Sequence, residues 1–213
     1  MADQMRSEDA RSDSELEAEI KALEASLYEQ TLALNELKKQ RRGTPVPDYT
    51  FESLLGPVTL SQLFGAHDRL LVIHNMGQAC RYCTLWGDGF NGFLPHLESA
   101  LSVVLVSKDA PELQQTFAHS RGWRFRMASH RGTTYLEEQA VQGQGNYPGA
   151  VAYRREGEQI YRLGDAAFGP GDLYCSQWNL LGLAGLTEAD WTPQFRYWQR
   201  PAKLEDGGAN LLD

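Results

Sequence analysis

Two cysteines separated by two residues are the strongest chemical signal in the sequence. The segment Cys80-Arg81-Tyr82-Cys83 begins four residues after a near-continuous apolar run, Leu70–Met76, and opens a stretch with helical spacing of apolar residues. The first turn of a helix offers unpaired N–H donors and about half a positive charge, which stabilise a thiolate and lower the pKa of its cysteine. Cys80 is therefore predicted to attack a disulfide, and Cys83, one turn further on, to resolve the mixed disulfide.

The two residues between the cysteines are the candidate substrate contacts. Arg81 is placed to help hold an anion at the helix start, and Tyr82 lies beside it. A zinc site is an alternative, with Cys175 and a histidine completing a tetrahedral set, but the sequence has no second C-x-x-C and no H-x3-H pair. Two small buried hydrophobic residues are the other alternative. We expect no metal and no cofactor.

A second candidate element is the segment Tyr147-Pro148-Gly149, directly before a predicted hairpin. Proline suits the first residue of a strand at an edge or a turn. A cis Tyr147–Pro148 bond is plausible, since proline lowers its cost to about 0.5–1 kcal/mol. A trans proline that simply starts the strand is the alternative.

The composition limits the classes of protein and partner. The chain has 213 residues, of which 42% are hydrophobic, so it can bury the core of one domain with an appendage. Its formal net charge of −8 argues against nucleic-acid and anionic-membrane partners. No apolar run approaches the roughly 20 residues of a membrane span, and Met1–Glu19 lacks the apolar core of a signal peptide. We therefore expect a cytoplasmic protein whose dithiol meets a thiol- or disulfide-bearing protein or small molecule.

A long N-terminal helix is predicted over residues 14–43, after a disordered tail at 1–13. Ser14 and Glu17 form a capping-box pattern, and apolar residues recur at heptad spacing, with Gln30 as the single interruption. This seam consists of Leu16, Ile20, Leu23, Leu27, Leu34 and Leu37. It either packs on its own domain or joins two copies as a homodimeric coiled coil. Gly43 ends the helix.

The main domain is predicted to span residues 44–200, with a flexible tail at 201–213. Strand patterns alternate with helix patterns and a hairpin follows, which indicates a three-layer α/β/α sandwich. The strands are expected at 70–76, 102–106, 125–129, 150–155 and 159–163, the helices at 83–99, 111–121 and 172–181, and a front hairpin at 46–63. No regular structure is predicted for residues 130–146.

The C-x-x-C after a central strand and the proline before a hairpin together resemble the thioredoxin superfamily. The resemblance implies a thioredoxin-like fold, in which Pro148 faces Cys80 and the backbone of Tyr147 pairs with the extended chain of a substrate. Thioredoxins keep a buried carboxylate six positions before the first cysteine, where this sequence has His74. A buried imidazole there could accept the proton of Cys83, and a hydrogen-bonded core histidine is the alternative.

Several longer stretches resemble a bacterial thioredoxin-like family of unassigned function that carries a C-x-x-C. They are LKKQRRGTPVPDYTF, GPVTLSQLFGAHDRLLVIHNM, CRYC, SRGWRF and PGAVAYRREGEQIY. The resemblance implies the fold and a redox role, and it names no substrate. The front hairpin and the strand near Phe125 resemble the peroxiredoxin elaboration of the fold. A peroxiredoxin has a proline and a threonine seven and three positions before its peroxidatic cysteine, however, and here these positions are Ile73 and Gly77.

A thiol–disulfide oxidoreductase that acts through Cys80 and Cys83 is therefore the preferred hypothesis. One alternative is a non-catalytic thioredoxin-fold binding module that uses the loops at 130–146 and 165–175. The other is a thiol peroxidase of unusual type.

Overall fold

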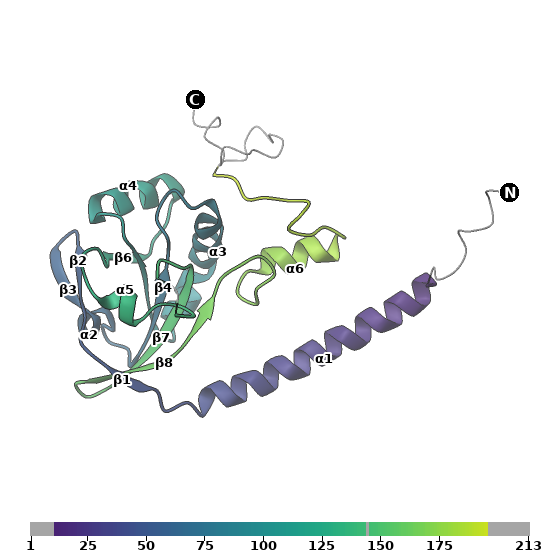
Figure 1. Cartoon of the computed structure of the whole chain (residues 1–213), viewed down its shortest axis with the longest axis horizontal. Helices are drawn as coiled ribbons and strands as arrows, with labels where there is room; N and C mark the ends of the chain where they lie inside the picture. The colour runs from purple at the N-terminus through teal and green to yellow at the C-terminus, as the bar shows by residue number, and fades with distance from the viewer. Residues whose placement is uncertain (1–10, 144, 196–213) are drawn as a thin grey trace. The chain divides into compact units, whose positions relative to one another are not determined.

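The computed structural model describes residues 11–143 and 145–195, which fall into two compact units (Figure 1). The first unit ends at Arg42 and contains the helix α1 (Asp13–Lys39), and the second begins at Gly43 and contains the remaining elements. The predicted tail at 201–213 and residues 1–10 of the predicted N-terminal tail lie outside the described residues.

The helix α1 starts before the predicted position. Its N-cap is Ser12, whose hydroxyl accepts a hydrogen bond from the Glu15 N–H, while the Glu15 carboxylate accepts one from the Ser12 N–H. The predicted cap at Ser14 and Glu17 was wrong. The sequence contains the capping pattern twice, and the upstream copy forms because it adds hydrogen-bonded residues to the helix. No residue of α1 is buried, so its apolar seam is exposed.

One mixed sheet of eight strands organises the described part of the second unit. The strands are β1 (Thr44–Val46), β2 (Thr50–Ser53), β3 (Gly56–Thr59), β4 (Arg69–His74), β5 (Ser102–Ser107), β6 (Arg126–Ser129), β7 (Gly149–Glu156) and β8 (Gln159–Ala167). Their order across the sheet is β1-β8-β7-β4-β5-β6-β2-β3. The strands β4, β5 and β6 run parallel, whereas β7 is antiparallel to both β4 and β8.

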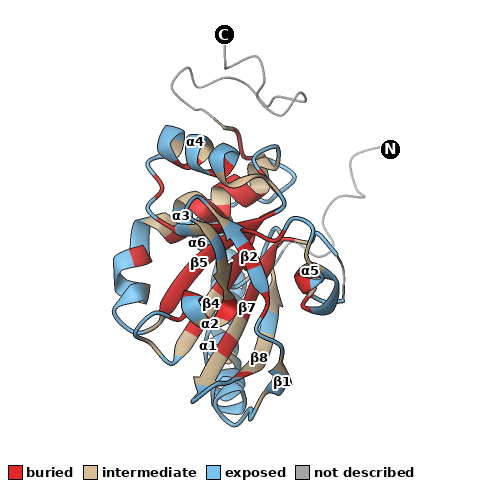
Figure 2. Cartoon of the chain, turned by 90° about the vertical axis from the view of Figure 1, so that its left-hand side faces the viewer, coloured by how far each residue is buried: buried red, intermediate tan, exposed pale blue. Residues whose placement is uncertain are grey.

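Helices cover both faces of this sheet, as three layers require. One face carries α3 (Arg81–Glu98), α4 (Pro111–Arg121) and α6 (Ser176–Leu183), and the other carries the short helices α2 (Leu60–Leu63) and α5 (Tyr135–Glu138). Side chains alternate along a strand, so β4 points Ile73 toward the α3 face and Val72 toward the α5 face. Figure 2 shows the buried residues concentrated in central strands such as β5.

The core of the second unit is thioredoxin-like. The parallel unit β4–α3–β5 is joined on the β4 side by the antiparallel hairpin β7–β8, which gives the partial order β8-β7-β4-β5. The strands β6, β2 and β3 extend the sheet beyond β5. The predicted α/β class and the long N-terminal helix are confirmed, and so is the order of elements from β4 onward apart from α5.

Three further segments differ from their prediction. The helix α6 begins at Ser176 instead of Asp172, because the Asp172 carboxylate accepts backbone N–H bonds from Gly169, Tyr174 and Cys175 and so holds a turn before the helix. Residues 130–146 contain the helix α5, and β1 forms by pairing with β8. Both elements are too short to show a periodic sequence signal.

Replacing Gly87 by alanine is expected to destabilise the protein by about 1–3 kcal/mol. The added Cβ would lie 2.4 Å from the ring of Trp123, which is held by a hydrogen bond from its Nε1 to Asp88. Gly89→Ala on the same helix is the control, because its Cβ meets nothing within 4 Å and should add up to about 1 kcal/mol of helix propensity. Urea unfolding measures both effects, and equal midpoints for the two variants would contradict the close packing.

Candidate active site

The two cysteines lie at the start of α3, as the sequence predicts. Cys80 is the N-cap residue, and its Sγ accepts a hydrogen bond from the Cys83 N–H at 3.1 Å. Both thiols are free, and Cys80 is partly exposed whereas Cys83 is buried. An accessible first sulfur with a second one turn deeper is the arrangement that thiol–disulfide exchange requires.

The surroundings of the two thiols shift their pKa values in opposite directions. The pKa of Cys80 is lowered to about 7, mainly by a hydrogen bond with the Cys83 thiol and further by the N–H groups of Cys83 and Tyr82 and the charge of Arg81, while burial opposes the change. The same thiol contact, together with burial, raises the pKa of Cys83. Near neutral pH the pair therefore holds a nucleophilic thiolate at Cys80 and a proton at Cys83.

Removing the Cys83 thiol is expected to raise the pKa of Cys80, because the main cause of its lowering disappears. Alkylation of Cys80 in Cys83→Ala should slow roughly three- to tenfold at pH 7, since the more basic thiolate is also more nucleophilic and recovers part of the loss. The pH profile of iodoacetamide alkylation, followed by mass spectrometry, measures the shift. Cys175→Ala should match the wild type, and an unchanged midpoint in Cys83→Ala would refute the thiol contact.

The loop between β4 and α3 is fixed by side chains on both sides. The Asn75 side-chain oxygen accepts the Gly77 N–H, and an Asp109 carboxylate oxygen accepts the Gln78 N–H, both at 2.8 Å. Gly77 has a φ of 114°, which favours glycine, and a Cβ there would lie 2.9 Å from the Asp109 carboxylate. The Gly77 carbonyl in turn accepts the Cys80 N–H at 3.1 Å. These contacts position Cys80 relative to β4 and the β5–α4 loop.

Aromatic side chains border the dithiol. Tyr82 packs near Trp86 of α3 and stacks on Trp178 of α6, with ring centroids 6.3 and 6.4 Å apart. Trp86 donates its Nε1–H to Asp172 at 3.0 Å, so the loop before α6 is attached to the dithiol helix. Cys175, at the N-cap of α6, is buried, and this burial raises the pKa of its thiol. Of the three cysteines, Cys80 is therefore the one expected to react near neutral pH.

The Tyr147–Pro148 peptide bond is trans, so the expected cis bond was wrong and the alternative of a trans proline is confirmed. Pro148 continues the extended strand, because its carbonyl accepts the Phe168 N–H at 3.0 Å and the β7–β8 ladder begins at Gly149. Gly149 pairs with His74, which places Pro148 at the end of the sheet from which the dithiol loop leaves β4. Two expectations about this segment stay predictions. They are that Pro148 faces Cys80 and that the Tyr147 backbone pairs with a substrate.

The structure places His74 on the opposite face of the sheet from α3. It follows Leu70 and Val72 at a spacing of two along β4, and its Nε2 is hydrogen-bonded to the Tyr135 hydroxyl at 2.8 Å. Burial, followed by the charges of His130 and Arg162, lowers its pKa to about 3, so the imidazole is neutral. Its surroundings match the alternative of a hydrogen-bonded core histidine rather than a proton acceptor for the dithiol.

Sequence reasoning missed the polar network that surrounds His74. The Tyr135 hydroxyl also accepts a hydrogen bond from Tyr153, which contacts Gln139, and Gln139 donates to the hydroxyl of Tyr49. Tyr49 directly precedes β2, Tyr135 and Gln139 come from α5 and its C-cap, and Tyr153 comes from β7. The three tyrosines belong to the core on the face of the sheet away from α3. Only a tyrosine-containing segment in the loop 130–146 could have indicated the network from the sequence.

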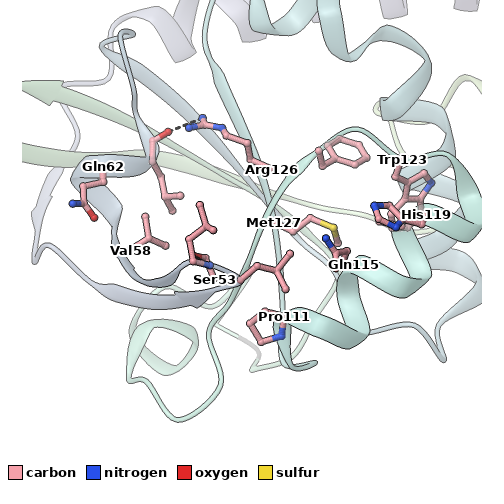
Figure 3. A pocket seen from close by; sticks show the side chains of 14 residues that line it. Ser53, Val58, Gln62, Pro111, Gln115, His119, Trp123, Arg126 and Met127 are labelled. Atoms are coloured by element: carbon pink, nitrogen blue, oxygen red, sulfur yellow. Dashed lines mark hydrogen bonds between the residues drawn. The ribbon is translucent and has the colours of Figure 1, made fainter.

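Two open pockets in the described part of the chain lie away from the dithiol. The first, of about 400 Å³, lies between the β2–β3 hairpin and α4, where Val58, Trp123 and Met127 line the same space (Figure 3). The second, of about 590 Å³, is lined by residues that include Tyr49 and Arg162. Neither of these two pockets is lined by Cys80, Arg81, Tyr82 or Cys83.

Residues 11–143 and 145–195 contain neither a cluster of metal-ligating side chains nor a helix that could span a membrane. No group of three or more His, Cys, Asp and Glu side chains is placed there to hold a metal ion. None of the helices in this part of the chain combines the length and apolarity that crossing a bilayer requires.

Comparisons with known proteins define a family and similar structures. Residues 5–200 match the family described as "Bacterial protein of unknown function (DUF899)", and no protein with a curated description matches the sequence. A cysteine mutant of peroxiredoxin Q from Xanthomonas campestris is similar at 18% identity and a TM-score of 0.48, over 64% of this chain and 89% of that chain. Peroxidoxin BcpB from Mycobacterium tuberculosis is similar at 19% identity and a TM-score of 0.46, over 60% of this chain and 85% of that chain. These values are too low to assign a function.

Proposed function

This chain belongs to the DUF899 family of bacterial proteins of unknown function, and we propose that it is a thiol–disulfide oxidoreductase acting through Cys80 and Cys83. One observation carries the proposal. The partly exposed Cys80 thiol caps α3, accepts a hydrogen bond from the Cys83 N–H and has a pKa lowered to about 7, and the Cys83 thiol that would resolve its mixed disulfide is buried, with a raised pKa.

The reaction proceeds in two exchanges. The Cys80 thiolate attacks one sulfur of a substrate disulfide, forms a mixed disulfide and releases the other sulfur as a thiolate. Cys83 then gives its proton to that leaving group or to water, attacks the Cys80 sulfur, and releases the second substrate sulfur as a thiolate, which takes a proton from water. The substrate gains two electrons, and the protein ends with a Cys80–Cys83 disulfide. A low-molecular-weight or protein dithiol must reduce this disulfide to restore the starting state.

The substrate of the proposed reaction is a protein or a small molecule that carries a disulfide. Arg81 and Tyr82 lie within the first turn of α3 and are the proposed contacts at the reacting sulfur, and the extended backbone at Tyr147 is proposed to pair with a peptide substrate. We place the reaction in the cytoplasm, where dithiols are kept reduced and a C-x-x-C is available as a reductant.

Trapping of the mixed disulfide tests the proposal. Reduced Cys83→Ser, exposed to oxidised glutathione, is expected to retain one glutathione on Cys80, because no thiol is left to resolve it. The wild type under the same conditions is expected to lose the glutathione and to gain the Cys80–Cys83 disulfide, seen as a mass two hydrogens lower. Peptide mapping by mass spectrometry identifies the modified cysteine.

Two control variants make the outcome decisive. Cys80→Ser is expected to take up no glutathione, and Cys175→Ser is expected to behave like the wild type. Adducts on Cys175, or the absence of any adduct on Cys80, would overturn the proposal in favour of a thioredoxin-fold binding module.

A further inference from the structure

The helix α1 exposes an apolar seam along its length, interrupted once, at Gln30. It has 27 residues and none is buried, and the seam residues Ile20, Leu23 and Leu27 are 54%, 58% and 59% exposed. The seam follows the heptad spacing that places the a and d positions of a coiled coil on one helix face. In this register the a positions are Ile20, Leu27 and Leu34, and the d positions are Leu16, Leu23, Gln30 and Leu37.

A helix with such a seam gains little stability by itself. Isolated helices are marginal in water, and most helical stability in proteins comes from burying an apolar face. A second copy of the same helix offers an identical seam, and a two-fold pairing lets each copy bury the other.

The charges of α1 determine which orientation of two copies is favourable. The first half of the helix is acidic, with Asp13, Glu15, Glu17, Glu19 and Glu24, whereas its end and the residues after it are basic, with Lys38, Lys39, Arg41 and Arg42. A parallel pair would place the two acidic halves together, with Glu19 of one copy opposite Glu24 of the other at flanking g and e positions. Like charges in such positions are unfavourable.

An antiparallel pair removes this repulsion. Each acidic half then lies beside the basic end of the other copy, and Glu17 and Lys38, both at e positions, fall opposite each other twice in the dimer. The two helix dipoles also oppose each other in this orientation. We propose that α1 is a dimerisation element that binds α1 of a second copy of this chain as an antiparallel coiled coil.

The mass in solution and a zero-length cross-link test the proposal on the full chain. Light scattering after gel filtration at micromolar concentration should give twice the 23.9 kDa of one chain. A carbodiimide should then join Glu17 to Lys38, identified by mass spectrometry. Within one helix these residues lie about 32 Å apart along the axis, so only an antiparallel partner can bring them into contact. A monomer mass, or a dimer without this cross-link, would overturn the proposal.

Matched substitutions on two faces of α1 separate the seam from the rest of the helix. Leu27→Glu lies on the seam and is expected to raise the dissociation constant at least tenfold. Leu32→Glu, on the opposite face and 50% exposed, is expected to leave it unchanged. The alkylation rate of Cys80 should be the same in both variants, which shows that the second unit stays folded. A dimer that survives Leu27→Glu as well as it survives Leu32→Glu would refute the seam.

Charge exchange provides the test of orientation. Glu17→Lys is expected to weaken the dimer, and adding Lys38→Glu in the same chain should restore its affinity, because each contact again joins opposite charges. Failure of the second substitution to rescue the first would overturn the antiparallel pairing. None of these measurements depends on redox activity, so the dimer can fail while the oxidoreductase proposal stands, and the reverse.

Discussion

Replacing Cys80 by serine is expected to lower the rate of disulfide reduction at least about a thousandfold, because a serine hydroxyl is not ionised near neutral pH and cannot displace a thiolate. Cys83 cannot take over the attack, since it is buried and its pKa is raised. The rate of the wild type should rise with pH through about 7, as Cys80 loses its proton. Reduction of insulin disulfides with dithiothreitol as the final reductant measures both effects.

The third cysteine supplies the control for this experiment. Cys175→Ser removes a thiol of similar burial to Cys83 from a different helix, and it is expected to leave the rate and its pH dependence unchanged. A wild-type rate in Cys80→Ser would show that the observed reduction does not pass through the dithiol, and the oxidoreductase proposal would then be abandoned.

The second large effect is on stability. Lowering the pH from 7 to 5 is expected to remove about 2 kcal/mol of unfolding free energy through His74 alone. Its pKa in the folded protein is about 3, against 6.5 ordinarily, chiefly because of burial. Below pH 6.5 the unfolded chain binds a proton at His74 and the folded protein does not, so stability falls with pH. The decline ends near pH 3, where folded His74 is protonated too.

A non-titrating variant isolates this contribution from the other acid-sensitive groups. His74→Gln keeps a side chain that can hydrogen-bond the Tyr135 hydroxyl but has no proton to bind in this range. Urea unfolding at pH 7 and pH 5 should show the free-energy difference between wild type and variant changing by about 2 kcal/mol in favour of the variant at the lower pH. A difference that stays constant with pH would show that His74 is not kept neutral by burial.

The dithiol was predictable because its signals are local. Two cysteines, the spacing between them and the apolar run before them are adjacent in the chain, and the N-cap position of Cys80 follows from the same few residues. Apart from α5, the order of strands and helices from β4 onward was also predictable from local patterns. Elements of three or four residues such as β1 and α5 were not, because they depend on partners far along the chain.

The surroundings of His74 were not predictable in the same way. The sequence shows that His74 shares a face of its strand with Leu70 and Val72, but it does not show which face α3 covers. That face is decided by the packing of the whole sheet, and the partner Tyr135 comes from 61 positions away in a loop without periodicity.

The order of strands has a consequence for aggregation. The two outermost strands, β1 and β3, have three and four residues, and each contains a proline, Pro45 and Pro57. A proline offers no N–H to a neighbouring backbone, and edge strands this short offer an approaching chain few backbone groups for hydrogen bonding. Both edges of the sheet are therefore protected against the addition of strands from other chains, which is how fibrils grow.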